Sequence, residues 1–91
     1  MALLLRIRQR ILDGDYFLSQ HAREEMHDDN LEREDVVQAI LCGRIERRFT
    51  ADPRGTRYCL VGPARDGRLV NVVLRFHEGG GLIVITVYVE E

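Results

Sequence analysis

The chain has 91 residues with 13 basic and 15 acidic side chains, which give a formal net charge of -2. This length suits one domain with one hydrophobic core, so we expect residues 1–91 to fold as a single unit. No run approaches the roughly 20 apolar residues of a membrane span, and arginines interrupt the apolar start where a secretory signal would continue. The composition therefore excludes a membrane protein and predicts a cytoplasmic location.

Charge is unevenly distributed along the chain. Residues 13–35 carry nine acids and two arginines, whereas residues 44–75 carry eight arginines and three acids. Every basic residue is arginine, whose planar guanidinium makes bidentate contacts to phosphate. A basic second half is compatible with a nucleic-acid partner even though the whole chain is weakly acidic.

Apolar residues at helical spacing predict two or three helices within residues 1–43. We expect the first over residues 2–12, the second from the N-cap Ser19 to about His27, and the third from after Leu31 to Cys42. Asp13-Gly14 ends the first helix, and the apolar residues 16–18 are predicted to be a link.

From residue 44 the apolar residues alternate, which is typical of strands. We expect four strands at residues 45–51, 56–61, 69–76 and 82–89, with turns between them. In the last strand, Leu82, Val84, Thr86 and Tyr88 should share one face, opposite Ile83, Ile85, Val87 and Val89. The fold class is predicted to be α+β, with the helices (1–43) packed on one face of a four-stranded antiparallel meander (44–91).

Cysteine and histidine spacing gives no support to a disulfide or a metal site. Cys42 and Cys59 are expected to be free thiols, and no cofactor is expected. No two metal-binding residues have the spacing that closes a zinc site. The glycines of HEGGG (77–81) lie between two strand patterns and are interpreted as a turn.

The stretch FLSQHAREEM places His21 in the first turn of a helix. The positive end of the helix dipole disfavours the imidazolium, so a neutral ring could serve as a general base. Glu24 or Glu25, one turn further on, could orient it. The alternative is a half-buried histidine that satisfies a loop carbonyl.

The stretch DPRGTRY places Arg54 and Arg57 on either side of a tight turn, with Tyr58 following. Arginines and an aromatic ring near a turn suit phosphate and base contacts. Solvated arginines at a strand end and a packed tyrosine are an equally simple explanation.

Taken together, LSQHAREEM, DVVQAILCG, RGTRYCLVG, DGRLVNVVLRF and LIVITVYVE resemble domain of unknown function (DUF) family 4258 over residues 15 to 90. The resemblance implies a link to the RelE-like, barnase and colicin nuclease superfamily, in which helices pair with a four-stranded antiparallel sheet. It implies a toxin-type endoribonuclease that needs no metal, acts on RNA alone or on the ribosome, and has an antitoxin partner. The RNA 2′-OH would attack the adjacent phosphate and leave a 2′,3′-cyclic phosphate.

The resemblance also implies roles for individual residues. His21 matches the family histidine and would be the base, oriented by Glu25, and Arg57 would hold the phosphate. Tyr88, or His77 in its place, would supply the proton, while Arg54, Arg75 and Thr86 would contact RNA. Where relatives carry a basic residue after the helical methionine, this chain has Asp28-Asp29-Asn30.

Three functional hypotheses follow. The first is the ribonuclease, and the second is an RNA- or protein-binding module of the same fold without catalysis. The third is an interaction protein, possible as a homodimer, that pairs through an open sheet edge and an apolar surface at Leu82 and Val84. Convergence of His21 and Arg57 in one cleft would distinguish the first hypothesis from the second.

Overall fold

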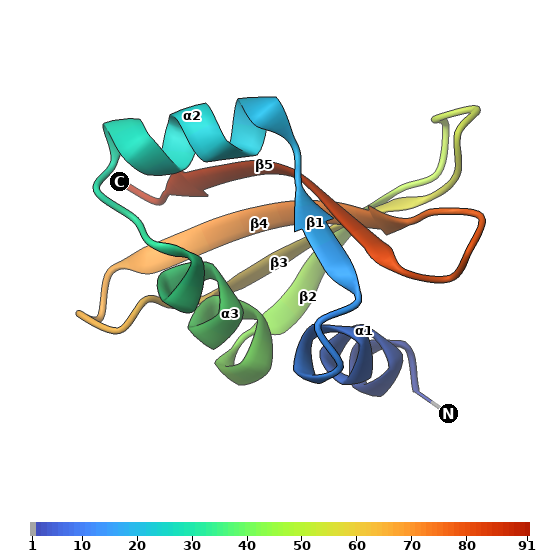
Figure 1. Cartoon of the computed structure of the whole chain (residues 1–91), viewed down its shortest axis with the longest axis horizontal. Coiled ribbons are helices and arrows are strands. Elements are labelled where there is room, and N and C mark those ends of the chain that lie inside the picture. Colours follow the sequence, from blue (N-terminus) through green and yellow to red (C-terminus); the bar gives the residue numbers. More distant parts are fainter. Residues whose placement is uncertain (1) are drawn as a thin grey trace.

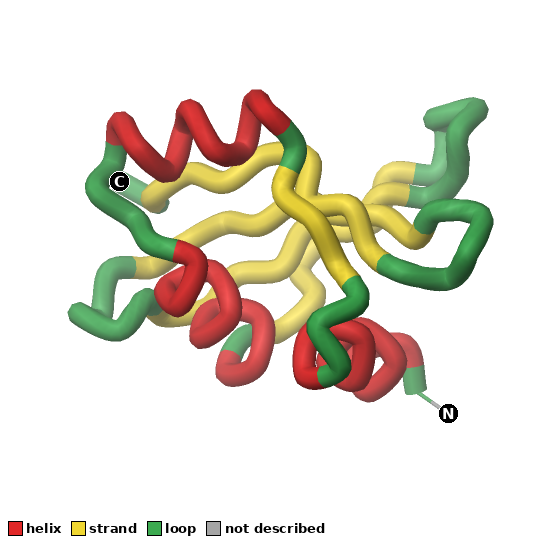
Figure 2. The backbone as a smooth tube through the Cα atoms, viewed as in Figure 1, coloured by secondary structure: helices red, strands yellow, loops and turns green. Residues whose placement is uncertain are grey.

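A computed structural model describes residues 2–91 of the chain, and Figures 1 and 2 show its course. No helix within these residues combines the length and the hydropathy needed to cross a membrane. The elements, in chain order, are α1 (Leu3–Leu12), β1 (Tyr16–Leu18), α2 (Gln20–Asp28), α3 (Arg33–Cys42), β2 (Arg44–Phe49), β3 (Arg57–Pro63), β4 (Leu69–Phe76) and β5 (Leu82–Val89).

The α+β class is confirmed, but the predicted four-stranded antiparallel sheet is wrong, and one strand lies within the part of the chain expected to be helical. The sheet has five strands in the order β1-β5-β4-β3-β2. Residues 16–18, expected to be a link, form β1 and pair in parallel with β5, with Tyr16 beside Leu82 and Leu18 beside Val84. Strands β2 to β5 are antiparallel to their neighbours.

The helices lie on one side of the sheet, as expected, and the hydrophobic core fills the space between the two layers (Figure 1). In Figure 1, α2 runs along β5, while α3 crosses β3 and β4. On β4, the side chains of Val70, Val72 and Leu74 point into this core and are fully buried. Burial of these side chains provides the main stabilisation of the domain.

The predicted faces of β5 are wrong beyond Val84. A β-bulge lies where Leu74 pairs with Val84 and its neighbour Val73 pairs with Thr86, so that one residue of β5 is extra. A single extra residue reverses the alternation, so Val87 joins Leu82 and Val84 in the core. Because Leu82 and Val84 are 0% exposed, the apolar docking surface that we expected from them does not exist.

Helix α3 packs directly against the backbone of β3. A Cβ atom placed on Gly62 would lie 2.1 Å from the carbonyl oxygen of Ala39, and one on Gly43 would lie 2.3 Å from that of Val61. No side chain fits at these two positions, and their glycines set the distance between helix and sheet. Arg8 of α1 closes the same corner by donating to the carbonyl oxygens of Ile40 and Gly43.

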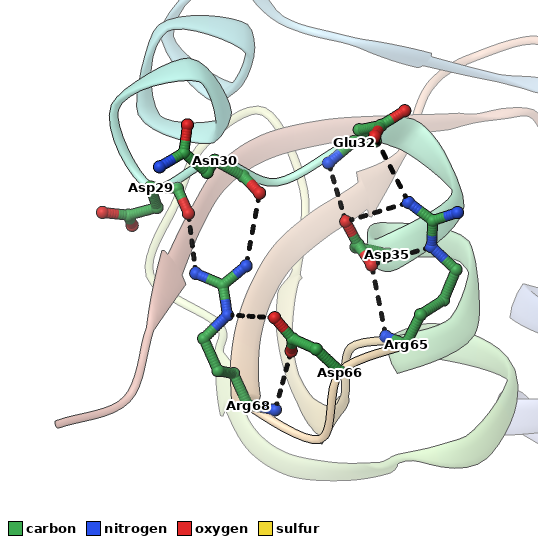
Figure 3. Close-up of polar contacts among 7 residues, drawn as sticks. All are labelled: Asp29, Asn30, Glu32, Asp35, Arg65, Asp66 and Arg68. Carbon is green, nitrogen blue, oxygen red and sulfur yellow. Dashed lines mark hydrogen bonds and ion pairs between the residues drawn. The ribbon is translucent and has the colours of Figure 1, made fainter.

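A carboxylate network at the start of α3 joins the helices to the β3–β4 turn (Figure 3). The Asp35 carboxylate accepts hydrogen bonds from the backbone N–H of Glu32 (2.8 Å) and from the backbone and side chain of Arg65 (3.2 and 3.0 Å). With the Glu32 side chain it forms a capping box, which satisfies the exposed N–H groups of the helix. The Arg65 bond lowers the pKa of Asp35 most, followed by the Glu32 bond, from 3.8 to about 2.

Loss of this network should destabilise the domain in a pH-dependent way. The folded-state pKa of Asp35 lies below its unfolded value, so its contribution is full above the unfolded value of 3.8 and is lost as pH falls toward 2. We expect Asp35→Asn to lower the free energy of unfolding at pH 6 by about 1–3 kcal/mol, and by less at pH 3.

Urea unfolding at both pH values measures this difference. Glu34→Gln is the control, because Glu34 is exposed in the same helical turn and lies outside the network. An equal loss of stability at pH 6 and pH 3 in Asp35→Asn would contradict the assigned role of its charge.

Candidate nucleic-acid interface

His21 lies in the first turn of α2, as predicted, and its side chain is 67% exposed. Its Nε2 atom lies 3.3 Å from Oε1 of Glu25, while Glu24 accepts instead from Gln20. The exposed ring therefore differs from the half-buried histidine considered as the alternative. A carboxylate beside one ring nitrogen is the arrangement that orients an imidazole.

Glu25 is occupied by contacts to β5. Its Oε1 atom accepts hydrogen bonds from the backbone N–H of Val87 (2.9 Å) and from the Thr86 hydroxyl. Val87 lies beyond the part of β5 that pairs with β1, so without Glu25 its N–H would have no acceptor at the sheet edge. Glu25 therefore attaches α2 to β5 and also holds His21. The Thr86 hydroxyl, which was predicted to contact RNA, is engaged in a hydrogen bond to Glu25.

Arg57 lies elsewhere, at the start of β3. Its Nε atom lies 3.3 Å from Oδ2 of Asp52, and its guanidinium lies 5.2 Å from the ring centroid of Phe49. Asp52 also accepts from the backbone and the side chain of Arg54, and these bonds lower its pKa. Asp52 thus neutralises part of the charge that Arg57 was expected to offer to a phosphate.

A pocket of about 590 Å³ brings together two of the predicted RNA-contact residues, Arg54 and Arg75. It lies between the β2–β3 and β4–β5 turns, which project from the same end of the sheet in Figure 1. Arg75 has no acidic partner within residues 2–91, so its charge is available. We call this the arginine–aromatic pocket; it is lined by Phe17, Pro53, Arg54, Arg75, Phe76, His77, Glu78 and Ile83.

Two aromatic side chains complete the pocket. The rings of Phe17 and His77 are stacked with centroids 5.5 Å apart and an interplanar angle of 10°. Phe17 is 55% exposed, although it is a large apolar residue. The Nδ1 atom of His77 accepts from the backbone N–H of Gly79 at 3.0 Å, which leaves Nε2 as the protonated nitrogen of the neutral ring. An exposed ring pair beside arginines is typical of a surface on which nucleobases stack.

Tyr88 lies at the other end of β5 and lines a different cavity, together with Asn71. Burial raises the pKa of its hydroxyl, so the phenol stays protonated at neutral pH. The predicted catalytic residues therefore lie in three different places. His21 and Glu25 are on α2, Arg57 is at the start of β3, and Tyr88 is near the C-terminal end of β5. The cavity lined by Arg57 and the cavity lined by Tyr88 do not include His21.

Sequence reasoning did not assign Phe17 to the interface, and it considered His77 only as an alternative proton donor. Phe17 lies in the apolar run of residues 16–18. Three residues are too few to show the alternation that would have predicted a strand with one exposed face. No group of three or more His, Cys, Asp or Glu side chains in residues 2–91 is arranged to hold a metal ion.

Comparison with known proteins gives one match. The family model described as domain of unknown function (DUF4258) matches residues 18–89. No curated protein and no solved structure matches the chain.

Removal of the Glu25 carboxylate should detach α2 from β5. We expect Glu25→Ala to lower the free energy of unfolding by about 1–3 kcal/mol, because the Val87 N–H loses its acceptor, and Glu25→Gln to lower it less. Urea unfolding at neutral pH measures both. Glu24→Ala is the matched control on the same helix, with an expected change below about 0.5 kcal/mol. Equal stability of the two alanine variants would show that Glu25 does not hold the helix.

Proposed function

The chain belongs to the family described as domain of unknown function (DUF4258), and from the site that it builds we propose that the protein binds single-stranded RNA at the arginine–aromatic pocket. The observation that carries this proposal is the exposed Phe17–His77 stack beside Arg54 and Arg75. Bases stack on aromatic rings whatever their sequence, and arginines bind the connecting phosphates.

The geometry of the pocket supports a flexible strand rather than a duplex. Arg54 comes from the β2–β3 turn and Arg75 from the end of β4, while the stacked rings come from β1 and the β4–β5 turn. A single strand can place a base on Phe17 and a neighbouring phosphate on Arg75, because its bases are free to turn outward. Protein-mediated reading of double-stranded RNA would instead need a long basic surface across successive grooves.

A second candidate is the metal-independent ribonuclease of a toxin–antitoxin pair, with the RelE-like chemistry that the family resemblance implies. The His21–Glu25 pair favours it, because a carboxylate 3.3 Å from an exposed imidazole is suited to acid–base work. Its difficulty is that Arg57 and Tyr88 do not share a cavity with His21. Cleavage would then require the RNA, the ribosome or another partner to complete the site.

Binding of RNA can be tested with a fluorescent, unstructured oligoribonucleotide in excess EDTA, followed by anisotropy. Phe17→Ala should weaken binding by about 5- to 150-fold, which corresponds to the loss of one base stack. Arg75→Ala should weaken binding and lower the slope of log K against log salt by about 0.7, the value for one phosphate on a single strand.

Arg23→Ala is the matched control, because Arg23 is exposed on α2 and lies outside the pocket. If it weakened RNA binding as much as Arg75→Ala does, binding would depend on net charge and the pocket assignment would be wrong. Binding that is unchanged in Phe17→Ala would exclude stacking at this ring.

The same RNA, incubated with the protein in EDTA and analysed for new 3′ ends, separates the two candidates. Bound but intact RNA, with and without ribosomes, supports the binding module. Cyclic-phosphate ends that disappear in His21→Ala would support the ribonuclease instead, provided that the variant unfolds at the same urea concentration as the parent.

A further inference from the structure

A second cavity lies at the end of the sheet opposite the arginine–aromatic pocket. It has a volume of about 670 Å³, and it is bounded by the end of α2, the start of β4 and the end of β5. Figure 1 shows the C-terminal end of the chain beside the last turn of α2. We call it the acidic cavity; it is lined by Asp28, Asp29, Asn30, Arg68, Asn71, Tyr88, Val89, Glu90 and Glu91.

The charge of this cavity is not neutralised within the protein. None of its four carboxylates, at positions 28, 29, 90 and 91, forms an ion pair in the part of the chain that the structure describes. Arg68 does not offset them, since it pairs with Asp66 and donates to the carbonyl oxygens of Asp29 and Asn30 (Figure 3). The C-terminal end of α2 adds the negative end of its dipole. A cation is therefore the favoured occupant.

Asn71 provides an independent sign that a ligand is missing. Its residue is only 6% exposed, and its Oδ1 atom accepts from Sγ of Cys59 at 3.7 Å. Its Nδ2 atom has no hydrogen-bond partner among the described residues. A buried donor without an acceptor is costly and rare, and a carbonyl oxygen brought into the cavity would relieve it.

Tyr88 indicates which kind of cation the cavity prefers. This residue is 44% exposed and lines the cavity, and a tyrosine ring attracts a guanidinium or an ammonium group through its face. Guanidinium suits the site best, because it pairs with carboxylates in a bidentate way and stacks on aromatic rings. A metal ion is disfavoured, since no group of three ligating side chains is assembled within residues 2–91.

We propose that the acidic cavity binds an arginine side chain from a basic peptide segment of a partner protein. The carboxylates of Asp28 and Asp29 pair with the guanidinium, which stacks on Tyr88, and a peptide carbonyl of the same segment accepts from Asn71. This site lies at the opposite end of the sheet from the RNA pocket and does not depend on it. The protein would then carry one surface for RNA and another for a basic polypeptide.

The test measures by calorimetry how tightly the whole protein binds a short arginine–glycine peptide that is acetylated and amidated at its ends. The same peptide with lysine in place of arginine is measured for comparison. The variant Asp28→Asn/Asp29→Asn should weaken binding of the arginine peptide on the order of tenfold, as expected for two ion pairs. Tyr88→Leu should weaken it by about three- to fivefold and should reduce the preference for arginine over lysine.

The control is Glu24→Gln/Glu34→Gln, which removes two exposed helix carboxylates outside the cavity and so gives the same net charge. It should bind the arginine peptide within about twofold of the parent. Equal weakening in both double variants, or equal affinity for the two peptides, would overturn the proposal in favour of general electrostatic attraction. Absence of peptide binding at low salt would also overturn it, whatever the result with RNA. Matching urea midpoints would confirm that each variant is folded.

Discussion

The hydrogen bonds of Ser19 decide how the first half of the chain meets the sheet. Its N–H donates to the carbonyl oxygen of Val84 (2.9 Å), which completes the pairing of β1 with β5. Its hydroxyl donates to the carbonyl oxygen of Ile85 (2.8 Å) and accepts from the N–H of Ala22 (3.0 Å), so the same atom caps α2. The chain can therefore change from strand to helix within one residue and still donate hydrogen bonds to the carbonyl oxygens at the bulged edge of β5. Further along α2, Glu25 accepts hydrogen bonds from the same edge of β5, and His21 is held beside its carboxylate.

The sheet separates charge between its two ends. The β2–β3 turn presents Arg54 and the end of β4 presents Arg75, whereas the end of α2 and the end of β5 present carboxylates that form no ion pair within residues 2–91. The opposite signs make the proposed RNA binding compatible with a net charge of -2, because local potential rather than net charge guides association. The sequence already contained a charge asymmetry, but only the fold shows which of these groups gather at each end of the sheet.

Sequence patterns predicted the structural features that depend on adjacent residues and missed those that depend on contacts between residues far apart in the chain. Strands 69–76 and 82–89 and the N-cap Ser19 were predicted correctly because alternation and capping are properties of a few adjacent residues. The strand β1 was missed because three residues show no period, and the bulge in β5 was missed because no residue in that run indicates an extra one. The ion pair of Asp35 with Arg65 and the stack of Phe17 on His77 join residues far apart in sequence, which spacing alone cannot reveal. The same limit explains why the sequence left open whether His21 and Arg57 converge.

The strand that the sequence concealed is also the one that builds the proposed RNA site. Parallel pairing sets Phe17 beside Ile83, which lines the arginine–aromatic pocket, while its neighbour Leu18 points into the core. A slip of one residue would bury Phe17 and expose Leu18, because successive side chains of a strand point to opposite faces. Burial of Leu18 thus fixes the register, and the register holds an apolar ring at the surface beside His77. The exposure of Phe17 is consequently a result of the fold, and it is stable enough to serve as a preorganised surface for a base.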